Sequence, residues 1–123
     1  MEKSIAVIGA SADHAKFGNK AVRAYLKKGW KVFPVNPKEK QLEGLQCFPA
    51  VEAIPEKIDA VSVYLPPAIG IGLLKGIQRK NPGIVYFNPG AESEEIKKNA
   101  GELGINAVFA CSIRAIGEDP ARY

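Results

Sequence analysis

The segment that follows the apolar run Ser4–Ile8 is the first candidate for chemistry. It reads Gly9-Ala10-Ser11, and Gly18 follows nine positions after Gly9. Glycine lets a backbone turn tightly or approach a ligand closely, and the free amides at the start of a helix favour a bound anion. Ser11 adds a hydroxyl donor and Lys16 adds a positive charge. The loop therefore predicts a phosphate-binding site, and the simpler alternative is that Gly9 only ends a strand.

A second loop bears on which phosphate compound would bind. The spacing of Gly9 and Gly18 departs from the G-x-G-x-x-G pattern of dinucleotide-binding loops, and an NAD site usually has an acidic residue after its second strand. Asn36-Pro37-Lys38 stands at that place. A lysine attracts a phosphate, so the loop favours NADP or a 3′-phosphorylated adenosine, as in coenzyme A, over NAD. The alternative for Lys38 is a solvated loop charge.

These loops need a scaffold, and apolar runs of strand length alternate with helical patterns along the chain. The predicted strands are residues 4–8, 31–35, 47–48, 60–65, 84–87 and 106–110. The predicted helices are residues 19–28, 67 to about 80, and 92–103, with a single turn at 51–54 and an irregular tail at 111–123. Such alternation predicts one α/β domain over residues 1–123, with a doubly wound, Rossmann-like, mostly parallel sheet and helices on both faces.

In a sheet of this kind, ligands bind outside the carboxyl ends of the strands. The residues that directly follow each predicted strand are therefore the candidates. They are Gly9-Ala10-Ser11, Asn36-Pro37-Lys38, Pro66-Pro67, Asn88-Pro89-Gly90 and Cys111-Ser112. We expect these five loops to converge on one edge of the sheet.

Composition excludes several classes of protein. Seventeen Lys and Arg residues against thirteen Asp and Glu give a net charge of +4, and these charges are too scattered to predict a nucleic-acid interface. No apolar run approaches the roughly 20 residues of a membrane span, and a strand beginning at Ser4 leaves no room for a signal peptide. Cys47 and Cys111 do not make a disulfide framework, and with one His they are too few for a zinc site. We therefore expect a soluble cytoplasmic protein that binds neither nucleic acid nor membranes.

Four motifs together carry a family resemblance. They are A-V-I-G-A-S near the start, V-N-P-K after the second predicted strand, V-Y-L-P-P after the fourth and F-N-P-G-A-E after the fifth. With these motifs in this order, the chain resembles the small CoA-binding domain proteins, which share their fold with the amino-terminal CoA-binding domain of the succinyl-CoA synthetase α subunit. The resemblance covers essentially the whole chain and implies coenzyme A as the ligand.

The resemblance also implies roles for particular residues. The phosphates would meet Gly9, Ala10 and Ser11, with Gly18 at the helix start. Apart from the resemblance, Phe17 beside Lys16 could cover the adenine, and the alternative is that it packs beneath the first helix. Asn36, Pro37 and Lys38 would flank the 3′-phosphate or the pyrophosphate. Leu65, Pro66 and Pro67 would line the adenine and ribose. The pantetheine arm would pass Asn88, Pro89 and Gly90, and Cys111 would lie near its thiol.

Binding is expected here rather than catalysis. The synthetase α subunit works through a phosphorylated histidine on a second domain, whereas the only histidine of this chain, His14, lies in the first loop. The sequence offers no nucleophile with a base, no metal spacing and no paired carboxylates in the strand-end loops. The alternatives are a domain that senses NADP or another nucleotide, and a CoA-ligase component active only with a partner subunit. A homodimer also stays open.

Cys111 has two interpretations. A free cysteine is most often a small buried core residue. At the ligand edge, however, its thiol could form a mixed disulfide with coenzyme A under oxidation. Cys47 lies in a short apolar segment and is predicted to belong to the core.

Overall fold

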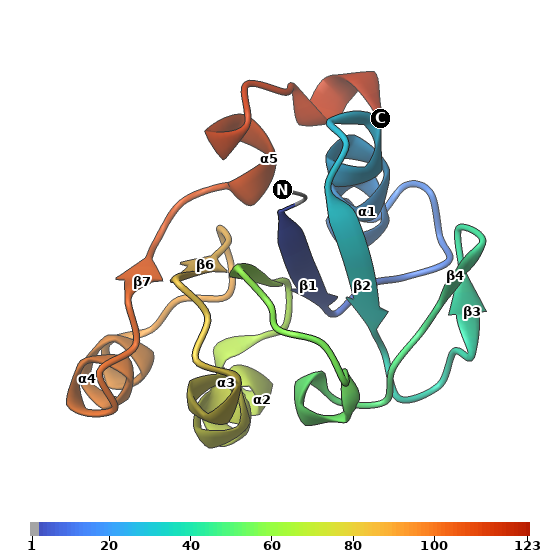
Figure 1. Ribbon diagram of the computed structural model, residues 1–123. Coiled ribbons are helices and arrows are strands. Elements are labelled where there is room, and N and C mark those ends of the chain that lie inside the picture. Colours follow the sequence, from blue (N-terminus) through green and yellow to red (C-terminus); the bar gives the residue numbers. More distant parts are fainter. Residues whose placement is uncertain (1–2) are drawn as a thin grey trace.

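A five-stranded parallel sheet forms the centre of the molecule (Figure 1). The computed structural model describes residues 3–123, so Met1 and Glu2 of the predicted domain lie outside the described residues. The order across the sheet is β2 (Lys31–Val35), β1 (Ser4–Ile8), β5 (Ala60–Val63), β6 (Ile84–Phe87) and β7 (Ala107–Val108). All neighbouring strands pair in parallel. The direction of winding reverses between β1 and β5, which is where open α/β sheets bind their ligands.

Helices cover both faces of the sheet, as Figure 1 shows. On one face lie α1 (Phe17–Lys27), α5 (Ser112–Ala115) and the short 3-10 turn η3 (Pro120–Arg122). On the other lie η1 (Val51–Ala53), α2 (Pro67–Gly70), η2 (Ile71–Leu73), α3 (Leu74–Lys80) and α4 (Glu94–Glu102). The predicted doubly wound α/β fold is therefore confirmed. No helix within residues 3–123 is long and apolar enough to cross a membrane.

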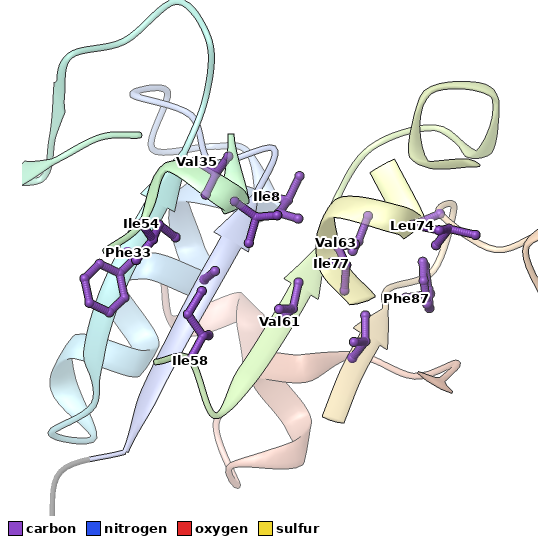
Figure 2. Close-up of a cluster of buried hydrophobic side chains, with 14 of the residues drawn as sticks. Ile8, Phe33, Val35, Ile54, Ile58, Val61, Val63, Leu74, Ile77 and Phe87 are labelled. Atoms are coloured by element: carbon purple, nitrogen blue, oxygen red, sulfur yellow. The ribbon is translucent and has the colours of Figure 1, made fainter. Parts of the chain in front are cut away.

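Alternate residues of the central strand pack against opposite layers. Ile5 and Val7 belong to the buried cluster that includes Tyr25 of α1, whereas Ile8 belongs to the cluster that includes Ile77 of α3. Figure 2 shows this second cluster between the sheet and α3. Because successive strand residues point to opposite faces, a strand covered on both sides is mostly apolar along its length. Ile5, Val7 and Ile8 each stabilise the fold by about 1.5–3 kcal/mol, and the one polar side chain of the strand, Ser4, is bonded to Asp59 and to the Lys57 carbonyl.

The segment between β2 and β5 differs from the prediction. Residues 36–44 are expected to form a loop. In the structure, the end of this segment and the two residues after it form a small antiparallel hairpin of β3 (Gln41–Leu42) and β4 (Leu45–Gln46). Its turn residues Glu43 and Gly44 both have positive φ, 51° and 75°. The strand predicted at 47–48 is reduced to one parallel bridge between Phe48 and Val35. This bridge extends the sheet beyond β2 by a single residue.

Two other segments differ in detail. The helix predicted from residue 67 to about 80 is divided into α2, η2 and α3. The tail expected to be irregular contains α5 and η3, and the last strand is confined to Ala107–Val108. Short helices of three or four residues have too little length for a hydrophobic period, so the sequence pattern does not reveal them. In the structure the tail packs against α1 as part of the domain, because Ile113, Ile116 and Tyr123 belong to the same hydrophobic cluster as Tyr25.

Candidate functional site

A cavity of about 1160 Å³ opens at the carboxyl ends of the strands. It lies at the reversal point between β1 and β5, as the sequence predicts. Most of the predicted site residues line it: Gly9, Ala10, Ser11, Lys16, Phe17, Gly18, Asn36, Leu65, Pro66, Asn88, Pro89, Gly90 and Cys111. Its volume exceeds the roughly 300–1,000 Å³ typical of sites for drug-sized ligands, so it has room for an extended cofactor.

Gly9 and Gly18 allow the first loop and α1 to meet closely. Gly9 has φ +87°, and a Cβ there would lie 3.1 Å from the Tyr64 carbonyl carbon. A Cβ on Gly18 would overlap the Gly9 carbonyl oxygen and lie 3.2 Å from the Ala10 Cα. Both contacts are with backbone atoms, which cannot rotate away. The two glycines are therefore required by backbone packing, and this packing brings the start of α1 against the loop.

The amino-terminal end of α1 faces the cavity without a side-chain cap. Lys16 occupies the cap position and offers no side-chain acceptor to the first turn. Among residues 3–123, no group accepts a hydrogen bond from the Phe17 or Gly18 amide. Lys16 and Lys20 both line the cavity, and the Lys20 ammonium lies 5.1 Å from the Phe17 ring centre. Free amides, the helix dipole and two cations together make this end suitable for a phosphate.

Hydrogen bonds from neighbouring elements hold the first loop in shape. The Asn36 Nδ2 donates to the Ala10 carbonyl at 2.8 Å, and the Asn36 Oδ1 accepts from the Lys38 amide at 2.8 Å. The Asn19 Nδ2 donates to the Ser11 carbonyl at 2.8 Å. The Ser11 Oγ accepts from the Asp13 amide at 3.0 Å, which leaves the Ser11 hydroxyl proton for another partner. Asn36 thus lines the cavity but uses its side chain to position two loops.

His14 lies outside the cavity and has a structural contact. Its Nε2 is 2.9 Å from the Glu43 Oε2, and its side chain is 64% exposed. The Asn19 Nδ2 donates to the same carboxylate at 3.1 Å. The hydrogen bond from Asn19 and the neighbouring His14 hold the pKa of Glu43 below its usual value. This contact joins the β3–β4 hairpin to the loop before α1.

Asn88 is a buried polar residue at the base of the cavity, and its side chain makes three hydrogen bonds. It is 1% exposed, and its Nδ2 donates to the Ser62 Oγ and to the Val63 carbonyl, both at 2.9 Å. Its Oδ1 accepts from the Ser112 amide at 2.8 Å. Asn88 therefore joins the ends of β5 and β6 to the start of α5, and its amide group has little capacity left for a ligand.

The carboxy-terminal segment supplies a wall that the sequence did not indicate. Arg114, Asp119, Pro120 and Ala121 line the cavity, as do Ala15, Lys20, Tyr64 and Ala91. The Arg114 guanidinium lies 3.9 Å from the Asp119 carboxylate, and both side chains are more than half exposed. Cys111 is half-buried on the same wall. Charged residues in a tail with no periodicity give no signal from which their place could be predicted.

Three predicted residues lie elsewhere. Pro37 lines a second, smaller cavity of about 200 Å³, whereas Lys38 and Pro67 line neither cavity. The second cavity also has Val35, Val51, Ile69 and Leu73 in its wall, and it shares Gly9, Asn36 and Leu65 with the larger one. The two cavities therefore adjoin each other at the first loop. Cys47 is 6% exposed in the core, as predicted.

Residues 3–123 contain no group of three His, Cys, Asp or Glu side chains that could hold a metal ion. The cavity chemistry available from the chain itself consists of backbone amides, the cations named above, hydroxyl groups, one thiol and the Asp119 carboxylate, which lies beside Arg114. Such a set is suited to holding an anionic, extended molecule.

Sequence relatives agree with this geometry. Residues 3–116 match the model of a family described as CoA binding domain. Subunit alpha of the ADP-forming acetate–CoA ligase II of Pyrococcus furiosus is 31% identical over 121 residues, covering 94% of this chain and 26% of that subunit. The ADP-forming acetate–CoA ligase I of Archaeoglobus fulgidus is 31% identical over 96 residues, covering 77% of this chain and 14% of the ligase. The chain spans about a quarter or less of these relatives.

Solved structures agree as well. A conserved hypothetical protein from Pyrococcus furiosus has a TM-score of 0.83 and 32% identity, covering 94% of this chain and 99% of that one. The dinucleotide-forming acetyl-coenzyme A synthetase 1 of Ca. Korarchaeum cryptofilum, in complex with phosphate and ADP, has a TM-score of 0.76 and 29% identity, covering 88% of this chain and 25% of that protein. The loops at the reversal point of the sheet and the match over residues 3–116 lead to one conclusion: the chain belongs to the CoA binding domain family.

Proposed function

We propose that the chain binds coenzyme A or an acyl-coenzyme A in the large cavity, with the pyrophosphate against Gly9-Ala10-Ser11. The observation that carries this proposal is the uncapped start of α1 beside Lys16 and Lys20. A pyrophosphate there accepts hydrogen bonds from free amides, and hydrogen bonds to a charged group each contribute about 1.5–3 kcal/mol. The room in the cavity matches a ligand much longer than a simple nucleotide.

The adenosine would lie toward β2. The second cavity adjoins the first loop there and has a largely aliphatic wall, which suits a flat purine ring. Pro37 lines this cavity, and Lys38 follows it on the exposed side of the loop. A 3′-phosphate on the ribose would then be within reach of a lysine rather than opposed by an acid. This arrangement favours coenzyme A, which has a 3′-phosphate, over NAD.

The pantetheine arm would run in the opposite direction, past the ends of β5 and β6. Pro89 and Gly90 are exposed at the rim, and Cys111 lies on the wall beyond them. The arm would therefore end near the only thiol in the cavity lining. The cavity lining runs from the phosphate loop to Arg114 of α5, which gives an extended arm room.

Holding the ligand, rather than transforming it, is the function that these side chains suit best. Asn36 and Asn88 use their amide groups to fix loops, and His14 is paired with Glu43 outside the cavity. We therefore propose a non-catalytic role for the isolated chain.

The test is the identity of the nucleotide that the protein retains. Freshly purified protein is denatured, and the released small molecules are separated and weighed by mass spectrometry. Coenzyme A or an acyl-coenzyme A is the expected result. Released NADP without coenzyme A would contradict the proposal and favour a domain that senses NADP.

A second candidate function is a component of a larger CoA ligase. The observation that favours it is the likeness to subunit alpha of the acetate–CoA ligase of Pyrococcus furiosus, of which this chain matches about a quarter. In that case the chain would acquire activity only with a partner subunit. Co-purification with a larger, ATP-binding subunit would support this role, and ligase activity that appears only on mixing the two would establish it.

A further inference from the structure

A line of buried hydroxyl groups runs beneath the wall of the cavity. Ser62 on β5 and Ser112 at the start of α5 are both 0% exposed, and their Oγ atoms are 2.7 Å apart. The Ser112 Oγ is 3.1 Å from the Tyr64 hydroxyl oxygen. At the other end, the Asn88 Nδ2 donates to the Ser62 Oγ at 2.9 Å. The line therefore runs from Asn88 through the two serines to Tyr64.

The direction of each hydrogen bond follows from burial. Ser62 accepts from Asn88, whose amide nitrogen can only donate, and within residues 3–123 the hydroxyl that lies within hydrogen-bond distance of the Ser62 Oγ is that of Ser112. If Ser112 donated to Ser62, the Ser62 proton would be buried without an acceptor, which is unfavourable. Ser62 must therefore donate to Ser112. By the same reasoning the Ser112 proton goes to the Tyr64 oxygen, the remaining hydroxyl within reach.

Tyr64 is then left with its own proton and no acceptor in the line. Unlike the two serines, Tyr64 is only half-buried, and it lines the large cavity. Burial raises the pKa of its phenol to about 12, so the group stays protonated at neutral pH. Accepting a hydrogen bond from Ser112 also strengthens Tyr64 as a donor, because hydrogen bonds in series polarise one another.

The place of this donor identifies its partner. The Tyr64 hydroxyl is bonded to Ser112, the residue that follows Cys111, so it lies at the Cys111 end of the cavity. In coenzyme A this end is the pantetheine arm, which has two amide carbonyls, and a thioester carbonyl when it is acylated. We propose that Tyr64 donates a hydrogen bond to a carbonyl oxygen on the arm of the bound coenzyme, oriented by the relay from Asn88. This inference rests on the proposed function.

Tyr64→Phe tests the donor because it removes the hydroxyl and keeps the ring. Two ligands are titrated calorimetrically: coenzyme A, and adenosine 3′,5′-bisphosphate, which lacks the arm. We expect the variant to bind coenzyme A about 2- to 10-fold more weakly, the range for one neutral hydrogen bond, and to bind the bisphosphate as the wild type does. Ser93→Ala is the matched control, since it removes the cap that accepts from the Ile96 amide of α4, outside the cavity lining. It should change neither affinity.

Ser112→Ala tests the relay. It should weaken coenzyme A in the wild-type background but have no further effect in Tyr64→Phe, because the two residues act in series. Equal weakening by Ser112→Ala in both backgrounds would overturn the relay. An unchanged coenzyme A affinity in Tyr64→Phe, or an equal loss for both ligands, would overturn the role of Tyr64. A wild type that binds neither ligand would instead refute the proposed function.

Discussion

Replacement of Gly18 by alanine tests whether the first loop and α1 form one unit. The new Cβ would overlap the Gly9 carbonyl oxygen and lie 3.2 Å from the Ala10 Cα, so the helix or the loop must move. Overpacking of this kind costs about 1–3 kcal/mol, and the better helix propensity of alanine offsets at most about 1 kcal/mol. We expect a net loss of about 1–2 kcal/mol in the free energy of unfolding, and a melting temperature lower by about 4–8 °C.

The same displacement should reach the ligand. Movement of the loop takes the Ala10 and Ser11 backbone away from a bound phosphate, and one lost hydrogen bond to a charged group costs about 1.5–3 kcal/mol. Coenzyme A affinity should therefore fall about tenfold or more.

The assays are urea denaturation and calorimetric titration, with Gly101→Ala as the matched control. Gly101 lies in α4, and a Cβ there would meet no atom within 4 Å. That variant should be more stable than the wild type by up to about 1 kcal/mol and should bind coenzyme A normally. A Gly18→Ala protein as stable as the wild type, with unchanged affinity, would refute the reasoning.

Lys38→Glu should weaken coenzyme A more than dephospho-coenzyme A, because only the former has the 3′-phosphate; equal weakening of both would remove Lys38 from that phosphate. Oxidised coenzyme A should form a mixed disulfide with Cys111 and release one free coenzyme A. Intact mass should show this adduct on the wild type and not on Cys111→Ser; no adduct on the wild type, or equal adducts on both, would exclude it. Glu43→Gln should reduce the loss of stability in acid. Because the pKa of Glu43 is lowered in the folded state, its contribution is present above the unfolded value of about 4.5 and is lost as the pH falls through the folded pKa; parallel pH profiles of the two urea midpoints would contradict this.

The sequence predicts those parts of the fold that rest on periodicity and glycine. The apolar run Ser4–Ile8 predicts a strand buried on both sides, and it is one. Val22, Tyr25 and Leu26 stand at helical spacing and predict α1; Val22 and Tyr25 are buried, whereas Leu26 is 36% exposed, and Gly29 ends that helix with φ +85°. These features follow from the spacing of apolar residues that face the hydrophobic core and from the glycine that ends a helix, so a single sequence is enough to identify them.

The parts that the sequence does not predict depend on contacts between distant segments. Ser112 is buried because α5 packs on the ends of β5 and β6, and no helical period in four residues indicates this. The hairpin turn at Glu43 depends on contacts with His14 and Asn19, which lie more than 20 positions earlier. Arg114 enters the cavity wall only because the tail folds back on α1.

Asn88 illustrates the same limit at the site itself. Its position after a strand predicts a ligand contact, and it does line the cavity. Its side chain, however, is fully engaged with Ser62, Val63 and Ser112. Sequence position identifies which residues reach the site, whereas their role depends on partners that only the folded chain brings near.

The most direct test of coenzyme A binding at the reversal point of the sheet is a calorimetric comparison of ligands on the purified chain. Coenzyme A and NADP are titrated under identical conditions into the wild type and into Gly18→Ala. We predict one coenzyme A per chain, no comparable binding of NADP, and a marked loss of coenzyme A affinity in the variant. Micromolar binding of NADP with no binding of coenzyme A would contradict the account.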